Sequence, residues 1–253
     1  HVRGCPRIAL YTAFETPVDE AQRGRFRGLV KRRGEGEPVA YLVGNKEFFS
    51  LPLRVSPAVL VPRPETEDLV VRVIDICRDS AAPRIADVGT GSGAIVVALA
   101  KHLPRATFLA TDISPEALEV ARENAARHGC ADRIEFVVCD LLDAPAGAGP
   151  WDVVVSNPPY VREDEFALLP RDVRLHEPRG ALVAGPRGVE VLERLAAVAA
   201  KRLVPGGWLL METGPAVAAA SETALEQQPE LVREPTLLDT AGLARVVRAR
   251  RRS

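Results

Sequence analysis

After residue 83 the chain alternates between short apolar runs and longer amphipathic segments, and this alternation leaves few possible folds. Strands are expected at the apolar runs Arg84–Val88, Ala106–Thr111, Ile134–Cys139, Trp151–Ser156 and Gly207–Glu212. Helices are expected between and after them, at about Gly93–Leu103, Pro115–His128, Gly188–Leu203 and Ala216–Gln227. Parallel neighbours need a crossover connection, so the alternation predicts a mostly parallel sheet covered on both faces by helices.

The end of the chain departs from this alternation. Two strand-like runs, Leu231–Leu238 and Leu243–Val247, are separated by a turn at Gly242, with no room for a helix. Strands joined so closely must be antiparallel. The chain is therefore expected to be an α/β protein with a seven-stranded sheet that is mostly parallel and has an antiparallel last strand. The basic run Arg248–Ser253 is expected to be a solvated tail.

Composition limits the possible functions. The 253 residues suffice for one large domain and a small appendage, and a formal net charge of −1 gives no general attraction to nucleic acid or anionic membranes. Cys5, Cys77, Cys130 and Cys139 lack Cys-x-x-Cys spacing, and the histidines lack ligand spacing, so no metal site is expected. No apolar run is long enough to span a membrane. We expect a soluble cytoplasmic protein without a stable nucleic-acid partner.

The first 61 residues differ from the rest. Residues 1–36 are basic and Gly-rich and contain one expected helix, at about Val18–Arg33, with start signals at Pro17 and Asp19. Residues 37–61 are expected to form a β-hairpin or an extended bridge. The first residue is not Met, which predicts a fragment or a processed chain.

A glycine-rich turn follows the first strand of the alternating region. It comprises Gly89, Thr90, Gly91, Ser92 and Gly93. Glycines let a ligand approach the backbone closely, and the start of the following helix favours an acidic ligand group. Nineteen residues after Gly93, Asp112 ends the next strand, where a carboxylate can accept hydrogen bonds from ribose hydroxyls. The pattern predicts an adenosine-containing cofactor. A purely structural turn is the alternative, and with Ala94 in the third position a dinucleotide also fits.

The third strand ends at Cys139-Asp140-Leu141. In a doubly wound sheet this position lies beside the adenine, because ligands gather at the carboxyl ends of the strands. Asp140 is a candidate acceptor for the adenine amino group, and Leu141 is a candidate for packing on the ring. An aspartate that simply ends a strand explains Asp140 equally well.

The fourth strand ends at Asn157-Pro158-Pro159-Tyr160. The two prolines stiffen the loop and lack N–H groups. The side-chain oxygen of Asn157 and the carbonyl of Pro158 are expected to accept both hydrogens of one –NH2 group, while Tyr160 offers a flat face to a planar amide or base. Pro159 is expected to contact the same group. A proline-rich turn without function is the alternative interpretation.

Such a pair of acceptors suits methylation of an amide nitrogen. The lone pair of an amide is delocalised, so acceptors on its hydrogens orient the lone pair and stabilise the positive charge that develops on nitrogen. The nitrogen must also lie in line with a methyl sulfonium, ~3–3.5 Å away. No general base is needed before transfer. Hydride transfer has no use for two acceptors, which favours S-adenosylmethionine as the cofactor and Asn157, Pro158 and Tyr160 as the catalytic residues.

Several segments together resemble the release factor glutamine methyltransferases, the HemK/PrmC family. The matching segments are Gly36–Leu42, Val61–Glu67, Asp87–Gly93, Ser156–Tyr160 and His176–Leu182. The Asn-Pro-Pro-Tyr motif alone is shared with DNA adenine and cytosine amino-methyltransferases, whereas Pro-Arg-Pro-Glu-Thr-Glu with Glu-Pro-x-x-Ala-Leu is far more specific. The similarity runs from about Gly4 to Val247.

The resemblance implies the Rossmann-like class I methyltransferase fold and methylation of the glutamine in the Gly-Gly-Gln loop of peptide chain release factors. It implies S-adenosylmethionine contacts at Gly89–Gly93, Asp112 and Leu141, with Asn157 also beside the cofactor, and the substrate amide at Asn157 and Pro158. It also implies three parts: residues 1–36 as the remnant of an N-terminal helical docking domain, 37–61 as a hairpin linker, and 62–253 as the methyltransferase domain.

Some residues and alternatives stay open at this point. Glu65 either borders the active site with Arg63 or caps its helix, and Arg162–Arg174 is either a substrate lid or a solvated loop. His176 and Glu177 are expected to order that loop. The other candidate functions are glutamine methylation of a ribosomal protein, DNA or RNA amino-methylation, and a binding module without activity. The sequence leaves the oligomeric state undetermined, with a monomer as the expectation.

Overall fold

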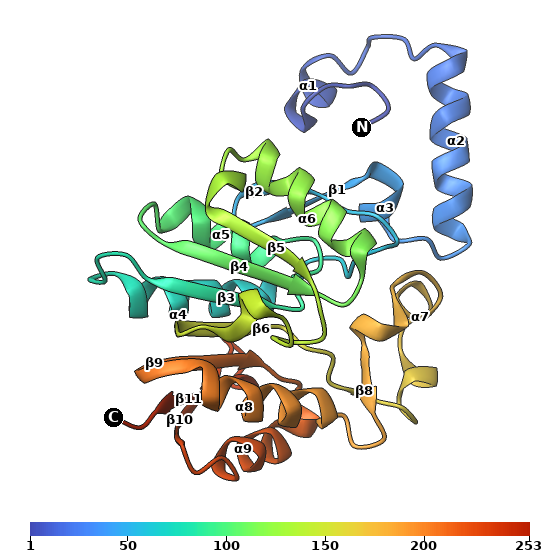
Figure 1. The fold of residues 1–253 in the computed structure, drawn as a ribbon. Helices are drawn as coiled ribbons and strands as arrows, with labels where there is room; N and C mark the ends of the chain where they lie inside the picture. The colour runs from blue at the N-terminus through green and yellow to red at the C-terminus, as the bar shows by residue number, and fades with distance from the viewer.

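The computed structural model describes residues 1–253 with the exception of one side chain, that of Arg7. Its centre is a seven-stranded sheet with the order β10-β11-β9-β6-β3-β4-β5 (Figure 1). The strands are β3 (Arg84–Val88), β4 (Thr107–Asp112), β5 (Ile134–Val138), β6 (Trp151–Ser156), β9 (Leu203–Glu212), β10 (Leu231–Leu238) and β11 (Ala244–Arg251). The pairs from β5 to β9 are parallel, and β11 is antiparallel to both β9 and β10. The predicted sheet is confirmed.

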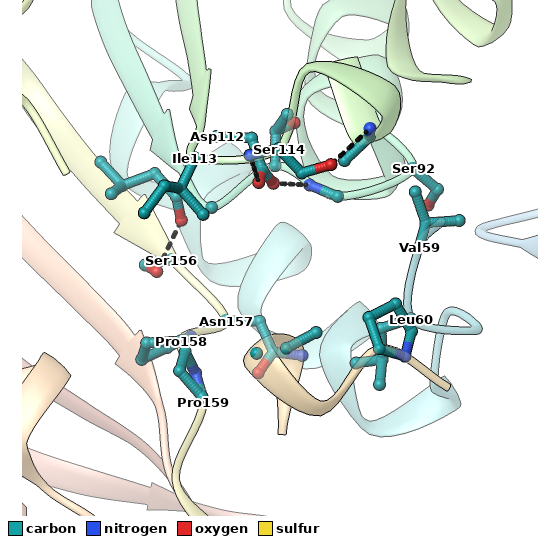
Figure 2. Close-up of a pocket in the computed structure, with 18 of the residues that line it drawn as sticks. Val59, Leu60, Ser92, Asp112, Ile113, Ser114, Ser156, Asn157, Pro158 and Pro159 are labelled. Carbon is teal, nitrogen blue, oxygen red and sulfur yellow. Dashed lines mark hydrogen bonds between the residues drawn. The ribbon is translucent and has the colours of Figure 1, made fainter. Parts of the chain in front are cut away.

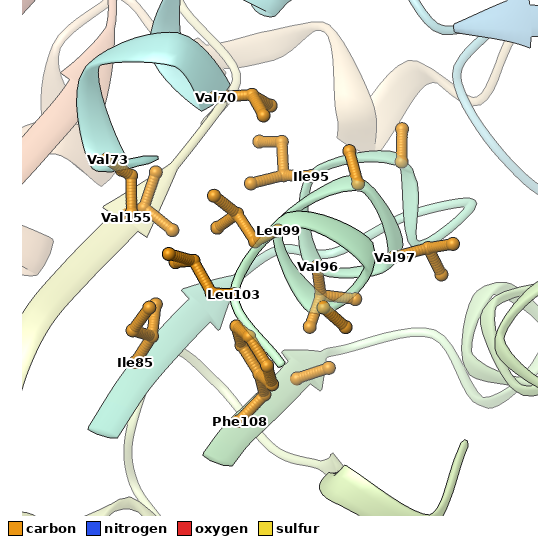
Figure 3. Packing of buried hydrophobic residues seen from close by; sticks show 14 of the residues in the cluster. Val70, Val73, Ile85, Ile95, Val96, Val97, Leu99, Leu103, Phe108 and Val155 are labelled. Carbon is orange, nitrogen blue, oxygen red and sulfur yellow. The ribbon is translucent and has the colours of Figure 1, made fainter. Parts of the chain in front are cut away.

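Helices cover both faces of the sheet (Figure 1). They are α4 (Glu67–Cys77), α5 (Ala94–His102), α6 (Pro115–Arg127), α8 (Glu190–Arg202) and α9 (Ala218–Glu226). Successive strand residues point to opposite faces, so Val153 and Val155 join the core under α4 and α5, while Val154 joins the core under α8 and α9. Figure 3 shows the first of these cores, where Leu99 of α5 lies among strand residues such as Ile85.

The N-terminal part carries more helix than its sequence predicts. It contains α1 (Arg7–Thr12), α2 (Glu20–Gly34), α3 (Val39–Val43) and the hairpin strands β1 (Asn45–Phe48) and β2 (Leu51–Arg54). The expected helix is α2, and Asp19 caps it by accepting a hydrogen bond from the backbone N–H of Gln22 at 2.7 Å. The expectation of a hairpin or extended chain over 37–61 was wrong for its first part, because α3 occupies it. A five-residue helix is too short to show a period in sequence.

The basic C-terminal run is not a solvated tail. Most of it belongs to β11, which lies between β9 and β10. Arg248 and Arg250 place their guanidinium groups 5.8 and 5.7 Å from the ring centroid of Trp208, and Arg252 donates to the carbonyl of Pro229 at 2.9 Å. Val247 and Ala249 are buried, while Arg248 and Arg250 are more exposed. The arginines therefore occupy outward positions, where their stems cover apolar surface.

The segment after β6 is also more ordered than expected. It forms β7 (Val161–Arg162), α7 (Arg171–His176) and β8 (Val183–Gly185), and β7 pairs with β8 in parallel. Within the stretch Arg162–Arg174, which the sequence left open as a substrate lid or a solvated loop, α7 begins at Arg171 and the residues between β7 and α7 form turns. Short 3-10 turns complete the chain at η1 (Pro64–Thr66), η2 (Ala131–Arg133), η3 (Pro145–Ala148), η4 (Phe166–Leu168), η5 (Arg179–Ala181) and η6 (Pro215–Val217). Across the described residues, no helix is both long and apolar enough to span a bilayer.

Candidate active site

The main cavity lies where the strand order reverses. β3 is the first strand of the alternating region, and it lies between β4 and β6 in the sheet. The chain builds the sheet outward from β3 first on the β4 side and then on the β6 side. The connections that follow β3 and β6 therefore diverge, and they leave a crevice at the carboxyl ends of these strands. A cavity of about 430 Å³ occupies this crevice, which is large enough for a small-molecule ligand. In Figure 2, Asp112 and Ser114 lie on one side of it, and Asn157 and Pro158 lie on the other.

The glycine-rich turn forms the floor between these two sides. Gly89, Gly91 and Gly93 have φ of 70°, 54° and 78°, a region that residues with a Cβ rarely adopt. At Gly93, the first residue before α5, an added Cβ would lie only 3.1 Å from the Cβ of Ala121 on α6. At Gly91 the corresponding space is open, so the backbone there is accessible to a ligand.

A buried carboxylate, which the sequence analysis did not assign, holds the turn from beneath. Asp87 is fully buried; its Oδ2 accepts from the hydroxyl of Thr90 at 2.7 Å and from the backbone N–H of Val96 at 3.2 Å. Burial raises the pKa of Asp87 to about 7, against the lowering effect of those hydrogen bonds. The sequence did contain a signal for this role, because Asp87 is an acidic residue in an otherwise apolar strand, two positions before a glycine.

Asp112 ends β4 beside the turn, as predicted. Its Oδ2 accepts from the backbone N–H of Gly91 at 2.9 Å, and its Oδ1 accepts from the backbone N–H of Ser114 at 3.0 Å. Each carboxylate oxygen can accept a second hydrogen bond. Asp112 therefore lines the cavity with acceptor capacity left for hydroxyl groups such as those of a ribose, which is the role predicted for it.

Leu141 and Asp140 line the same end of the cavity. Leu141 has φ of 52°, a strained value for a leucine, and its carbonyl is held by the hydroxyl of Thr111 at 2.7 Å. Asp140 pairs with Arg194 of α8, which also lines the cavity. Arg194 was not predicted as a cavity residue, because no feature of an amphipathic helix sequence distinguishes one arginine from the others. Any role of Asp140 toward adenine has to compete with this ion pair.

Asn157 follows β6 directly and lies across the cavity from Asp112 and Ser114 (Figure 2). The end of the strand is fixed by Ser156, whose hydroxyl donates to the carbonyl of Val88 at 2.7 Å. The Nδ2 of Asn157 donates to the hydroxyl oxygen of Thr66 at 3.2 Å. Because Oδ1 is the other end of the same planar amide, it points away from Thr66. Pro158 and Pro159 line the cavity beside it.

Tyr160 lies behind the cavity wall rather than in it. Its hydroxyl donates to Oε1 of Glu212 at 3.4 Å, and its ring packs so closely on Gly214 that a Cβ there would lie 3.1 Å from it. Burial, and then the nearby Glu212, raise the pKa of Tyr160. From the sequence, Tyr160 is expected to contact the substrate directly. The structure places it one layer away, against the second core.

Arg63 and Glu177 form an ion pair at the entrance. The guanidinium Nη2 of Arg63 donates to Oε1 of Glu177 at 2.5 Å, and Oε2 accepts from the backbone N–H of Val61 at 3.2 Å. Glu177 is buried, so this pair ties the end of α7 to the segment before α4, in line with the ordering role expected of it. Glu65 is exposed, and Thr66, which the sequence analysis did not single out, is the buried residue of that turn.

Comparison with known proteins decides the family. Residues 1–44 match the model of the PrmC N-terminal domain, and residues 85–180 match that of a methyltransferase domain. A release factor glutamine methyltransferase of Rhodopirellula baltica is 46% identical over 251 residues, which cover 98% of this chain and 85% of that protein. One of Bradyrhizobium diazoefficiens is 46% identical over 237 residues, covering 92% and 79%. The chain belongs to the release factor glutamine methyltransferase family.

Solved structures confirm the fold class. A methyltransferase from Pyrococcus furiosus superposes with a TM-score of 0.59 at 16% identity, over 93% of this chain and all of that one. The ribosomal protein L11 methylase of Lactobacillus delbrueckii gives 0.55 at 24% identity, over 79% and 86%. The class I methyltransferase fold is confirmed. The chain is an S-adenosylmethionine-dependent methyltransferase, and the open backbone at Gly91 and the acceptors of Asp112 fit that cofactor.

Proposed function

We propose that this chain methylates the side-chain amide nitrogen of a glutamine in a peptide chain release factor, with S-adenosylmethionine as methyl donor. The names of its relatives support the substrate. The observation that carries the proposal is the side chain of Asn157 at the end of β6, which donates to Thr66 and lines the same cavity as the glycine-rich turn and Asp112. A cytoplasmic location belongs to the same proposal, because release factors act on ribosomes.

The residues that would hold the cofactor are those around the glycine-rich turn. The backbone of Gly89–Gly93 and the carboxylate of Asp112 suit the polar groups of a nucleoside, and Leu141 suits an apolar ring. When bound, the sulfonium supplies an electrophilic methyl group. Val59 and Leu60 line the cavity near Asn157 (Figure 2), and such apolar walls exclude water from the reacting nitrogen.

Asn157 and Pro158 act on the substrate in this proposal. Oδ1 of Asn157 and the carbonyl of Pro158 accept the two amide hydrogens of the glutamine. The nitrogen lone pair would then be directed at the methyl group. The acceptors would stabilise the positive charge that develops on nitrogen as the N–C bond forms and the S–C bond of the sulfonium breaks, with S-adenosylhomocysteine as the leaving group. The methylated nitrogen is acidic, so it loses its extra proton after transfer, once solvent reaches it.

Parallel offers of substrate test the proposal. Purified protein and S-adenosylmethionine with a labelled methyl group are given to a release factor, a ribosomal protein and DNA in separate reactions. We expect label in the release factor alone, at a glutamine identified by mass spectrometry of its peptides. Label in the ribosomal protein or DNA, with an unlabelled release factor, would overturn the proposed substrate.

The substitution Asn157→Ala tests the chemistry separately. It removes one acceptor from the amide nitrogen, so we expect kcat to fall by about a hundredfold or more, as for the loss of one preorganised transition-state hydrogen-bonding group. Cofactor affinity, measured by calorimetry, should stay within about threefold, because the proposed nucleoside contacts follow β3, β4 and β5. Unchanged turnover would refute the role of Asn157.

A further inference from the structure

A buried row of side chains stands behind Asn157. Glu212, at the end of β9, is 2% exposed, and Thr66, in the turn before α4, is 4% exposed. Oε2 of Glu212 accepts from the hydroxyl of Thr66 at 2.6 Å, and the hydroxyl oxygen of Thr66 accepts from Nδ2 of Asn157 at 3.2 Å. Three separate elements therefore meet in one continuous line that ends at the cavity.

The direction of these hydrogen bonds is set by the carboxylate. An ionised carboxylate only accepts, so the single proton of the Thr66 hydroxyl must point at Glu212. What Thr66 then offers on its other side is a lone pair, which requires a donor. Of the two ends of the Asn157 amide, only the –NH2 end can donate. Its oxygen must then face the opposite way.

We propose that Glu212 and Thr66 are positioning residues that fix the acceptor end of Asn157 toward the substrate. This inference rests on the proposed function, in which that oxygen accepts from the glutamine –NH2 group. Rotated by half a turn, Asn157 would present its own –NH2 group to that of the substrate, and neither group could accept. The two ends of an asparagine amide have almost the same shape, so packing alone distinguishes them poorly.

The burial of Glu212 is otherwise hard to explain. A carboxylate in an apolar core is costly, and a well-packed apolar residue of similar volume is often as stable or more so. The hydroxyl of Tyr160, 3.4 Å from Oε1, is a second donor to Glu212 and also requires an acceptor there. We therefore assign Tyr160 the role of a hydrogen-bond donor to Glu212, behind the substrate site, and not that of a residue in contact with the substrate.

Protonation of Glu212 would remove the directing effect, because a carboxylic acid can donate to Thr66. Burial raises the pKa of Glu212, while hydrogen bonds from Thr66 and Tyr160 and the charge of Arg245 lower it. The charge of Glu65 adds to the rise, and Arg245 is shared with Asp239 in an ion pair at 2.8 Å. We therefore expect kcat to fall as the pH drops through the raised pKa of this group.

Two variants of Thr66 test the row in the full-length protein. Thr66→Val keeps the shape and loses the hydroxyl, so kcat should fall by about tenfold or more, with cofactor affinity within about twofold. Thr66→Ser should retain kcat within about threefold. The matched control is Thr236→Val, which removes a threonine–glutamate hydrogen bond between β10 and α9 and should leave kcat unchanged. Equal losses in both Thr66 variants, or no loss in Thr66→Val, would overturn the assignment.

The acid limb of the pH profile tests Glu212. In Glu212→Gln the side chain no longer titrates, so the fall of kcat at low pH should disappear and kcat should be lower throughout. The double variant with Thr66→Val should be about as slow as the slower single variant, because both changes break one row. An unchanged acid limb in Glu212→Gln, or multiplied losses in the double variant, contradicts the inference.

A spectroscopic measurement separates this inference from the proposed function. In ¹⁵N-labelled protein the side-chain amide signal of Asn157 is identified by its loss in Asn157→Ala. We expect slow hydrogen exchange for it in the wild type and faster exchange in Thr66→Val but not in Thr66→Ser. If the three proteins show these exchange rates and the wild type nevertheless methylates no release factor, the proposed substrate is wrong, but the role of Glu212 and Thr66 in orienting Asn157 is supported. Equal exchange rates in the wild type, Thr66→Val and Thr66→Ser would show that the Thr66 hydroxyl does not hold the amide of Asn157.

Discussion

At the scale of single residues, two buried carboxylates at strand ends shape the site. Glu212 directs Asn157 through Thr66, and Asp87 holds the glycine-rich turn through Thr90 and Val96. Among the described buried side-chain atoms, Oδ1 of Asp87 has no hydrogen-bond partner. A buried acceptor without a partner is costly, so Asp87 holds the glycine-rich turn at a cost in stability.

The substitution Asp87→Asn should change how stability depends on pH. The pKa of Asp87 is about 7 in the folded protein and close to the ordinary value of about 3.9 in the unfolded chain. The folded state therefore binds the proton more tightly, and wild-type stability falls as pH rises between these two values, then levels off. The asparagine side chain of the variant can still accept from Thr90 and Val96, and it does not titrate.

Urea unfolding at pH 5, 6, 7 and 8 checks this expectation. The free energy of unfolding of Asp87→Asn, relative to wild type, should rise by about 1–3 kcal/mol between pH 5 and pH 8. The exposed Asp79 supplies a control, because Asp79→Asn should give a curve parallel to the wild type. A parallel curve for Asp87→Asn as well would show that Asp87 is ionised throughout.

The substitution Asp112→Ala should act on cofactor binding. It removes the acceptors expected for the ribose and the ties to Gly91 and Ser114, so the Kd for S-adenosylmethionine should rise by about tenfold to a hundredfold. Titration calorimetry measures this directly. With saturating cofactor, kcat should fall much less than it does in Asn157→Ala. An unaltered Kd would show that the ribose contact lies elsewhere.

At the scale of elements, the site depends on how closely α5 approaches α6. Gly93 is where the turn passes into α5, and Ala121 of α6 leaves only 3.1 Å for an added Cβ. The close approach brings the start of α5, with its free N–H groups, to the cavity edge. A larger residue at either position would separate the two helices and shift the turn.

A pair of glycine substitutions isolates this contact. Gly93 and Gly129 both have positive φ, at 78° and 65°, but a Cβ at Gly129 would meet nothing within 4 Å. Gly129→Ala should therefore cost about 1–2 kcal/mol of unfolding free energy from backbone strain alone. Gly93→Ala should cost about 1–3 kcal/mol more, from overpacking. Equal losses in chemical denaturation would mean that the helices yield without penalty.

The sequence predicts those elements that are stabilised by their own residues, and it does not predict those that depend on contacts with distant residues. β3, β4 and β6 are buried on both faces and read as short apolar runs, and α2 carries its own capping residue. By contrast α3, β7 and β8 are too short to show a period and form through contacts with other elements. In the row behind Asn157, Thr66 lies 146 residues from Glu212 and 91 residues from Asn157 in the sequence. Local sequence patterns cannot predict contacts over such separations.

At the scale of the whole molecule, β11 holds the end of the sheet together. It pairs with β9 on one side and with β10 on the other, and its Val246, Val247 and Ala249 are buried in the two cores. Arg245, also on β11, lies near Glu212 and Tyr160. The last strand thus contributes to the sheet, to both cores and to the electrostatics behind the active site.

Shortening the chain tests this role. A chain ended after residue 243 loses β11 and leaves β10 without a neighbour, so we expect it to lose cooperative unfolding and to aggregate. A chain ended after residue 251 keeps β11 and loses only the last two residues, with the hydrogen bonds from Arg252 to the carbonyls of Pro229 and Glu230. Its free energy of unfolding should lie within about 1–2 kcal/mol of that of the full chain. A folded, monodisperse product of the shorter chain in circular dichroism and gel filtration would contradict this view.

The place of β11 inside the sheet also separates the order of synthesis from the order of assembly. β10 leaves the ribosome before β11, yet its neighbour in the sheet is β11. Strands β3 to β9 can pair as they emerge, whereas β10 must wait as an unpaired edge until the following strand arrives between it and β9. Any folding intermediate in which β11 has not yet inserted exposes the free edges of both β9 and β10, and non-native strand pairing would begin at those edges.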